Sequence, residues 1–270
     1  MIAAIGSIMH ARTGKNLEAP QAGNASRPAN NLLCRLRQED FALIAAHLEP
    51  RERGAGELLY NPGDNVEYVH FPCGHALASF LVPNEDGRDV ETVLVGREGA
   101  AGGIVSAGWL PAYCRITVKY SGPFVQLRAG ILQQAKASSS TLRNLFTRYA
   151  DCMLAQVFQS TACNAIHTIE QRAAKWIIAA MERTGDHNVP LTHDQLATML
   201  GVGRSYTSRV LQSLKADGIL TTGRGTLRVQ SFDRLSARAC SCNEAVKTHF
   251  EAVLSGIYPD EIGRNSSPAD

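Results

Sequence analysis

The segment from Leu191 to Leu220 constrains the fold of this chain more than any other, because it combines a helix start, a sharp turn and a second helix. Thr192 and Gln195 have the spacing of a capping box, which predicts that a helix begins there. Gly201 follows the last apolar residues of that helix and supplies the left-handed backbone that a tight connection between helices requires. A second helix is predicted over 204–216. The segment therefore predicts a helix-turn-helix.

The predicted second helix has one apolar face and one polar face. Its polar face carries two guanidinium groups and several hydroxyl or amide side chains, and it has no carboxylate. Arg can donate two hydrogen bonds to guanine, Gln can pair with adenine, and Ser can reach phosphates. The helix N-terminus also favours phosphate. This composition is typical of a recognition helix in the major groove; the polar stripe consists of Arg204, Ser205, Ser208, Arg209 and Gln212.

The residues that follow predict a β-hairpin with a basic tip. Strand-like runs at 219–222 and 226–230 flank the turn Gly223-Arg-Gly225, which completes a winged helix-turn-helix. From Gly185 to Arg238, seven Lys and Arg stand against four Asp and Glu, a net charge of +3. The whole chain has a net charge of only +2. Any contact with nucleic acid is therefore local to this unit.

The chain from Arg53 to Leu127 has a different pattern, with short apolar or alternating runs between turn formers such as Asn61-Pro-Gly-Asp64. This pattern predicts a compact antiparallel barrel or sandwich. A short helix that ends before Pro50 should precede it, and the non-periodic residues 1–30 should form a flexible tail. The predicted strands cover 57–60, 66–71, 76–82, 90–95, 115–120 and 124–127.

Residues 138–166 contain neither Pro nor Gly and carry an apolar stripe wider than a heptad seam. We expect this helix to pack on the barrel with one side and on a second copy of the chain with the other. The alternative is a core helix buried wholly within one chain. Thr168 and Gln171 form another capping box and start a further helix that ends at Gly185. The expected dimerisation residues are Leu142, Leu145, Phe146, Tyr149, Met153 and Val157.

The order of short barrel, long helix and winged helix-turn-helix resembles the Crp/Fnr family of bacterial transcription regulators over about residues 40–235, most strongly at 191–220. The resemblance implies an α+β fold with an N-terminal antiparallel β-barrel or jelly roll of the cyclic-nucleotide-binding type. The expected organisation is a tail (1–30), a sensor domain (31–136), a dimerisation helix (137–166), a winged helix-turn-helix domain (167–238) and a C-terminal tail (239–270).

The resemblance also implies a function, namely sequence-specific regulation of transcription by a homodimer on a near-palindromic site in double-stranded DNA. RNA polymerase is a further candidate partner. Ser205 stands where the best-known members have an acidic residue, so we expect a different preferred half-site. The expected DNA-binding residues are Thr192, Arg204, Ser205, Tyr206, Ser208, Arg209, Gln212 and Arg224.

The loop that binds cyclic AMP in some members of this family differs here. Those members have Gly-Glu followed further on by an Arg that pairs with the phosphate, whereas Ala112-Tyr113 occupies the place of that Arg and its neighbour. The charge of a buried phosphate costs free energy that a neighbouring cation must offset, and Ala112-Tyr113 provides no such cation. We therefore expect no binding of cyclic nucleotides. Arg97 and Glu98 are candidate effector contacts, although a solvated glycine-rich loop is the simpler interpretation.

The seven cysteines are odd in number and scattered, which argues against a disulfide framework. The iron–sulfur cluster of oxygen-sensing relatives needs closely spaced N-terminal cysteines, and only Cys34 precedes Cys73. Cys240-Ser-Cys242 is a close pair, but two thiolates without a second pair make a weak metal site. We therefore expect no metal and no cofactor. Cys152 and Cys163 are interpreted as buried thiols, with redox switches as the alternative.

No apolar run approaches the roughly 20 residues that cross a bilayer, and the N-terminal apolar run lacks the basic start of a secretory signal. We expect a cytoplasmic protein without a membrane partner. The glycine-rich runs lack the Lys and Ser or Thr of a P-loop, and no nucleophile and base pair is visible, so we expect no enzyme. The alternatives are a ligand-binding module whose C-terminal unit contacts protein and, as the weaker rival, an enzyme that uses the barrel cavity.

Overall fold

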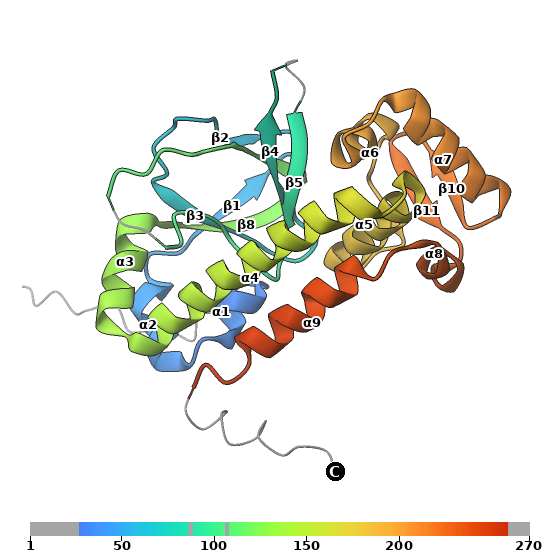
Figure 1. Cartoon of the computed structure of the whole chain (residues 1–270). Helices are drawn as coiled ribbons and strands as arrows, with labels where there is room; N and C mark the ends of the chain where they lie inside the picture. Colours follow the sequence, from blue (N-terminus) through green and yellow to red (C-terminus); the bar gives the residue numbers. More distant parts are fainter. Residues whose placement is uncertain (1–26, 86–88, 106–107, 259–270) are drawn as a thin grey trace, which may run out of the picture.

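A computed structural model describes residues 27–85, 89–105 and 108–258 (Figure 1). The chain folds into an N-terminal unit of two antiparallel sheets, a long helix, and a C-terminal unit of helices with a small sheet. Most of the expected N-terminal tail, residues 1–26, lies outside the described residues, and the first helix begins at Asn31. Within the described ranges, no helix is both long enough and apolar enough to cross a membrane.

The N-terminal unit is a sandwich of two four-stranded sheets with the strand orders β1-β8-β3-β6 and β2-β7-β4-β5. All strand pairs are antiparallel. Phe124 from the first sheet packs with Ala78 and Val118 from the second, so the alternating apolar residues meet between the sheets. The strands are β1 (Glu49–Arg53), β2 (Leu58–Tyr60), β3 (Tyr68–Pro72), β4 (Leu77–Pro83), β5 (Asp89–Val95), β6 (Ala101–Gly102), β7 (Arg115–Tyr120) and β8 (Gly122–Arg128).

The six strands predicted from alternation are all present within a few residues of their expected bounds. The sequence did not reveal β1 or β6. β1 has the sequence EPRER with no apolar alternation, because it is an edge strand whose central side chains are exposed. Pro50 lies inside this edge strand, where a missing N–H is tolerated, and the helix before it already ends at Ala45.

Helices α1 to α3 lie beside the sandwich, and α4 runs from it toward the C-terminal unit (Figure 1). Tyr149 fixes α4 to the N-terminal unit, since its hydroxyl donates to the carbonyl of Ala100 and accepts from the N–H of Ala100, both at 2.9 Å. The helices of this half are α1 (Asn31–Arg35), α2 (Gln38–Ala45), α3 (Ala129–Ser138) and α4 (Ser140–Ile166).

The burial of α4 corrects part of the expected dimer interface. Leu142, Leu145, Phe146 and Tyr149 are at most 1% exposed inside the chain's own core, so they offer no surface to a second copy. Met153 packs partly against the same core. The sequence showed one wide apolar stripe, and the structure divides it into a buried side and an exposed side. Of the six predicted residues, Val157 lies on the exposed side, at 40% exposure.

The expectation of a C-terminal tail from residue 239 is wrong for its first part. Residues Cys242–Leu254 form α9, which packs along α4 (Figure 1). Leu254, Ile257 and Tyr258 join the core cluster of α4, and the Tyr258 hydroxyl donates to Asp40 Oδ2 at 2.8 Å. Glu244 and Glu251 lie on the exposed, outer side of the amphipathic helix α9.

The C-terminal unit is built on α5, whose residues Arg172 to Met181 are all buried. The predicted capping box of Thr168 and Gln171 is present, and Gly185 ends the helix in the left-handed conformation. The core of this unit also includes Leu77 and Leu94 of the second sheet, so the two units share one apolar cluster. The elements of this half are α5 (Ile169–Thr184), β9 (Asn188–Val189), α6 (His193–Leu200), α7 (Arg204–Ala216), β10 (Leu220–Gly223), β11 (Thr226–Val229), α8 (Phe232–Arg238) and α9.

A buried histidine makes the stability of the sandwich dependent on pH. His70 on β3 is 4% exposed, and its Nδ1 has no hydrogen-bond partner among the described residues. Burial lowers the pKa of His70 to about 4, below its ordinary value of 6.5. The unfolded chain therefore binds the proton first as the pH falls, so the stabilisation from neutral His70 is complete above pH 6.5 and decreases toward pH 4.

We predict that His70→Phe removes part of the loss of stability in acid. Urea unfolding of the natural chain should lose on the order of 2–3 kcal/mol between pH 6.5 and pH 4 through this group, and the variant should lose less. The exposed His249 provides the control, because His249→Gln should leave the pH dependence unchanged. Equal pH dependence in the natural chain and in His70→Phe would contradict the assignment.

Candidate DNA-binding interface

The helix-turn-helix consists of α6 and α7. The Thr192 hydroxyl accepts from the N–H of Gln195 at 3.1 Å, and Gln195 Oε1 accepts from the N–H of Thr192 at 2.9 Å, so the predicted capping box is present. Gly201 ends α6 with φ 67°. A side chain at this φ is strained by contact of its Cβ with the following carbonyl oxygen. The end of α6 and the sharp turn that follows it, both predicted from the sequence, thus occur at Gly201.

Helix α7 has the predicted bounds, Arg204 to Ala216. Its inner face is formed by Thr207, Val210, Leu211 and Leu214, all buried against the body of the C-terminal unit. Its N-cap is Gly203, which makes no side-chain capping bond. The N–H groups of the first turn consequently receive no side-chain cap from Gly203, and their dipoles favour an anion at this end of the helix.

The outer face of α7 is open to solvent. Arg204 has 69% of its side chain exposed, Tyr206 is 45% exposed, and Arg209 is also exposed. Ser208 is half-buried, and its hydroxyl hydrogen-bonds to His193 Nδ1 at 2.9 Å, a contact that connects α7 to α6. The outer face of α7, as the structure has it, consists of Arg204, Ser205, Tyr206, Arg209, Gln212 and Ser213.

Both guanidinium groups of this face have a neighbour on the surface. Arg204 Nη1 lies 3.2 Å from Asp194 Oδ2, and both side chains are more than 60% exposed. Such an exposed pair contributes at most about 1 kcal/mol, so Arg204 can exchange Asp194 for a base or a phosphate at little cost. The guanidinium of Arg209 lies 5.0 Å from the ring centroid of Tyr206. This cation–π contact reduces the freedom of the Arg209 side chain before any ligand binds.

The wing lies beside this face. Gly223 pairs with Thr226, which leaves Arg224 and Gly225 as the loop, and Arg224 is exposed at the tip. A third strand, β9, extends the sheet in the order β10-β11-β9, which the sequence did not reveal because it is only two residues long. Arg238, by contrast, forms ion pairs with Glu170 and Asp217 and so contributes to the packing of the unit.

The structure places all eight predicted DNA-binding residues in this unit, in three positions. Six are on α7, Arg224 is at the wing tip, and Thr192 is half-buried at the start of α6, where its hydroxyl serves the cap. The predicted effector residues lie elsewhere. Glu98 Oε1 accepts from Arg183 Nε of α5 at 2.8 Å and from the N–H of Gly96 at 3.0 Å.

Arg97 and Glu98 line a cavity of about 230 Å³ between the N-terminal unit, α5 and α9. This cavity lies outside the interior of the sandwich. The ion pair of Glu98 with Arg183 links the loop at 96–99 to the first helix of the C-terminal unit. Tyr113, which the resemblance aligned with a ligand contact, is 85% exposed.

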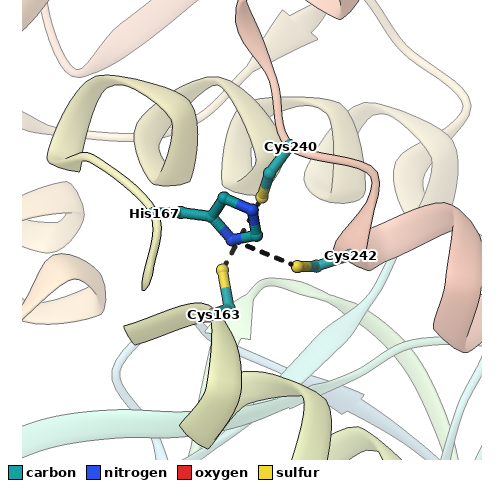
Figure 2. A group of neighbouring side chains, drawn as sticks. All are labelled: Cys163, His167, Cys240 and Cys242. Carbon is teal, nitrogen blue, oxygen red and sulfur yellow. Dashed lines mark hydrogen bonds between the residues drawn. The ribbon is translucent and has the colours of Figure 1, made fainter. Parts of the chain in front are cut away.

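One group of side chains was not recognised from the sequence. Cys163, His167, Cys240 and Cys242 converge at the junction of α4, α5 and α9 (Figure 2). In the sequence, Cys163 is an isolated cysteine, and Cys240 and Cys242 form a close pair with no second pair of metal ligands nearby. Two signals were available: the close pair Cys240-Ser-Cys242, and the spacing of Cys163 and His167, which are four residues apart and therefore on one face of a helix.

Comparisons with known proteins agree with this geometry. Residues 171–238 match the model of the Crp-like helix-turn-helix domain. FixK2 from Bradyrhizobium japonicum has a similar structure, with 16% identity, a TM-score of 0.62, and coverage of 72% of this chain and 98% of that one. The c-di-GMP responsive regulator CLP from Xanthomonas campestris shows 15% identity, a TM-score of 0.60, and coverage of 72% and 100%.

A transcriptional regulator of the Crp/Fnr family from Eubacterium rectale shows 16% identity, a TM-score of 0.59, and coverage of 79% of this chain and 97% of that one. No curated protein sequence matches the chain at a significant level. The C-terminal unit thus matches the Crp-like helix-turn-helix domain over residues 171–238, and the chain as a whole shares the fold of these solved structures.

We predict that Gly201→Ala weakens both the C-terminal unit and its binding to DNA. The added Cβ meets an unfavourable φ of 67° and should cost about 1–2 kcal/mol of unfolding free energy. Thermal unfolding and fluorescence anisotropy with labelled DNA measure the two effects. Gly130→Ala is the matched control, since Gly130 lies in α3, where an added Cβ would meet no atom within 4 Å and Ala should be tolerated. Equal stability of the two variants would contradict the role of Gly201.

Proposed function

We propose that this protein is a homodimeric, sequence-specific regulator of transcription in which α7 enters the major groove of DNA. The observation that carries the proposal is the outer face of α7, which presents two exposed guanidinium groups, hydroxyls and an amide, and contains no carboxylate. A helix held by its apolar face with such side chains pointing outward has the features required for hydrogen bonds to base edges. The proposal assigns no catalytic step, in agreement with the regulators that the chain resembles.

Different residues of the interface have different tasks in this proposal. Arg204, Arg209 and Gln212 contact bases, and Ser205 contacts a base or a phosphate near the open N-terminus of α7. Tyr206 contacts phosphate through its hydroxyl, while Ser208 and Thr192 act mainly by holding α7 and α6 in place, as their hydrogen bonds support. Arg224 at the wing tip contacts the backbone of the adjacent groove. Phosphate contacts fix the position of the protein, and base contacts select the sequence.

The exposed side of α4 supports the homodimer. Leu154, Val157 and Phe158 are 50%, 40% and 64% exposed, and Ala150 and Thr161 extend them at helical spacing. Large apolar side chains arranged in one continuous stripe mark a surface for another protein. Packing of two α4 helices along this stripe would relate two α7 helices by a two-fold axis. Such a dimer binds a near-palindromic site with half-sites about 34 Å apart. The proposal places this dimer in the cytoplasm, with RNA polymerase as a further partner.

We predict that Arg209→Ala and Arg224→Ala affect DNA binding in different ways. Loss of Arg209 should reduce discrimination between the preferred site and random DNA by about 1–3 kcal/mol. Loss of Arg224 should weaken binding to both DNAs alike and reduce the salt dependence. Sites selected from random oligonucleotides and titrations at several salt concentrations provide the measurement. Arg51, exposed on β1, offers a control substitution, Arg51→Ala, that should change neither quantity. Equal loss on both DNAs for Arg209→Ala would reject a base contact.

We predict that Leu154→Glu combined with Phe158→Glu converts the dimer to a monomer and lowers DNA affinity at least about tenfold, because two half-sites are no longer bound together. Analytical ultracentrifugation at micromolar concentration measures the first effect. The control is Asn144→Glu, which places the same charge on an exposed position of α4 outside the stripe. A natural chain that sediments as a monomer of about 29 kDa would refute the homodimer.

A further inference from the structure

Four side chains from two distant segments of the chain point toward one another (Figure 2). Cys163 lies in the last turn of α4, His167 caps that helix, Cys240 lies in the connection to α9, and Cys242 is its first residue. One donor atom from each lies within 4.8 Å of the others. Cys163 and Cys240 have their sulfurs 3.6 Å apart, and Cys242 Sγ lies 3.5 Å from His167 Nδ1.

These separations agree with the edges of a tetrahedron around one small cation. Zinc binds thiolate sulfur at about 2.3 Å and imidazole nitrogen at about 2.0–2.1 Å, which places tetrahedral sulfurs about 3.8 Å apart and sulfur and nitrogen about 3.5 Å apart. We propose that Cys163, His167, Cys240 and Cys242 bind one zinc ion in a closed structural site. Four protein ligands complete the coordination, so the ion has no open position for a reactant.

The charges around the group agree with this assignment. Binding of zinc to three thiols and a neutral imidazole releases three protons and leaves a centre with a net charge of −1. Lys175 Nζ lies 3.5 Å from Cys163 Sγ, and Arg172 lies within electrostatic reach of Cys163 and Cys240. Both cations are buried, at 7% exposure, and neither forms an ion pair with a carboxylate of the described residues. The anionic centre would supply the counter-charge that buried cations require.

The surroundings also resemble the outer shell of a metal site more than an apolar core. Gln159 Nε2 donates to Cys242 Sγ at 3.1 Å, the type of hydrogen bond that orients a thiolate ligand. The three cysteines form a buried cluster of their own, separate from the larger apolar clusters of the chain. A disulfide between Cys163 and Cys240 is the main alternative. It would need the two sulfurs to approach to about 2.05 Å and would leave Cys242 and His167 without a shared partner.

The site would join the sensor unit to the DNA-binding unit. Its ligands come from the end of α4, from the residue before the α5 cap, and from both sides of the start of α9. A zinc ion would fix the angle between α4 and α5 and hold α9 along α4. Metal binding is therefore expected to stabilise the whole chain, because the ligands are not preassembled when the chain is unfolded.

The experiment measures metal in the full-length chain, independently of DNA. The purified protein should contain about one zinc per chain by plasma mass spectrometry, and cobalt should replace it with the visible bands of tetrahedral thiolate coordination. Cys240→Ser and Cys242→Ser should each lose stoichiometric metal. Cys34→Ser and Cys73→Ser change thiols outside the group and should retain it.

A second measurement covers the case in which the ligand variants fail to fold. In the natural chain, alkylation followed by mass spectrometry should find Cys163, Cys240 and Cys242 protected, and a chelator should expose them and lower the melting temperature. A natural chain that stays folded by circular dichroism but takes up neither zinc nor cobalt would overturn the proposal. A metal-free chain whose mass shows the loss of two hydrogens at Cys163 and Cys240 would overturn it as well, in favour of a disulfide.

Discussion

The burial of α5 on two sides is the constraint on which the arrangement of this molecule depends. A helix on the surface of a unit buries one stripe, yet the ten residues from Arg172 to Met181 are all buried. One side of α5 forms the core of the helix-turn-helix with residues such as Leu196 and Leu211, and the same apolar cluster reaches Leu77 and Leu94 of the second sheet. The C-terminal unit is therefore held on the N-terminal unit by a shared core, reinforced by the ion pair of Arg183 with Glu98.

Local signals in the sequence predicted the local geometry well. The capping boxes at Thr168 and Thr192, the turn at Gly201 and the bounds of α7 depend on residues within a few positions of one another, and each is present as predicted. The pattern of alternation also located six strands. β1 and β6 escaped because one is a charged edge strand and the other has two residues, so neither has the alternation on which the prediction depends.

The features that the sequence did not reveal depend on contacts between distant segments. The apolar stripe of α4 gave no indication of which part faces its own chain, since that choice depends on α9, a helix that begins 76 residues after α4 ends. The group of Cys163, His167, Cys240 and Cys242 is assembled by the same packing. Each half of it is an unremarkable pair in the sequence, and only the position of α9 along α4 brings them together.

These contacts locate the point at which the geometry of DNA binding can change. In the proposed dimer, the distance between two α7 helices depends on three connections: α4 with its copy, α4 with α5, and α5 with α7. The connection of α5 with α7 is an extensive apolar core. The proposed connection of α4 with its copy is a long helix face. The joint between α4 and α5 at His167 and Thr168 has instead the small cysteine cluster. The core that α5 shares with the second sheet already restrains this joint, and an ion bound by the cysteine group would add a second restraint on the angle at which α7 meets DNA.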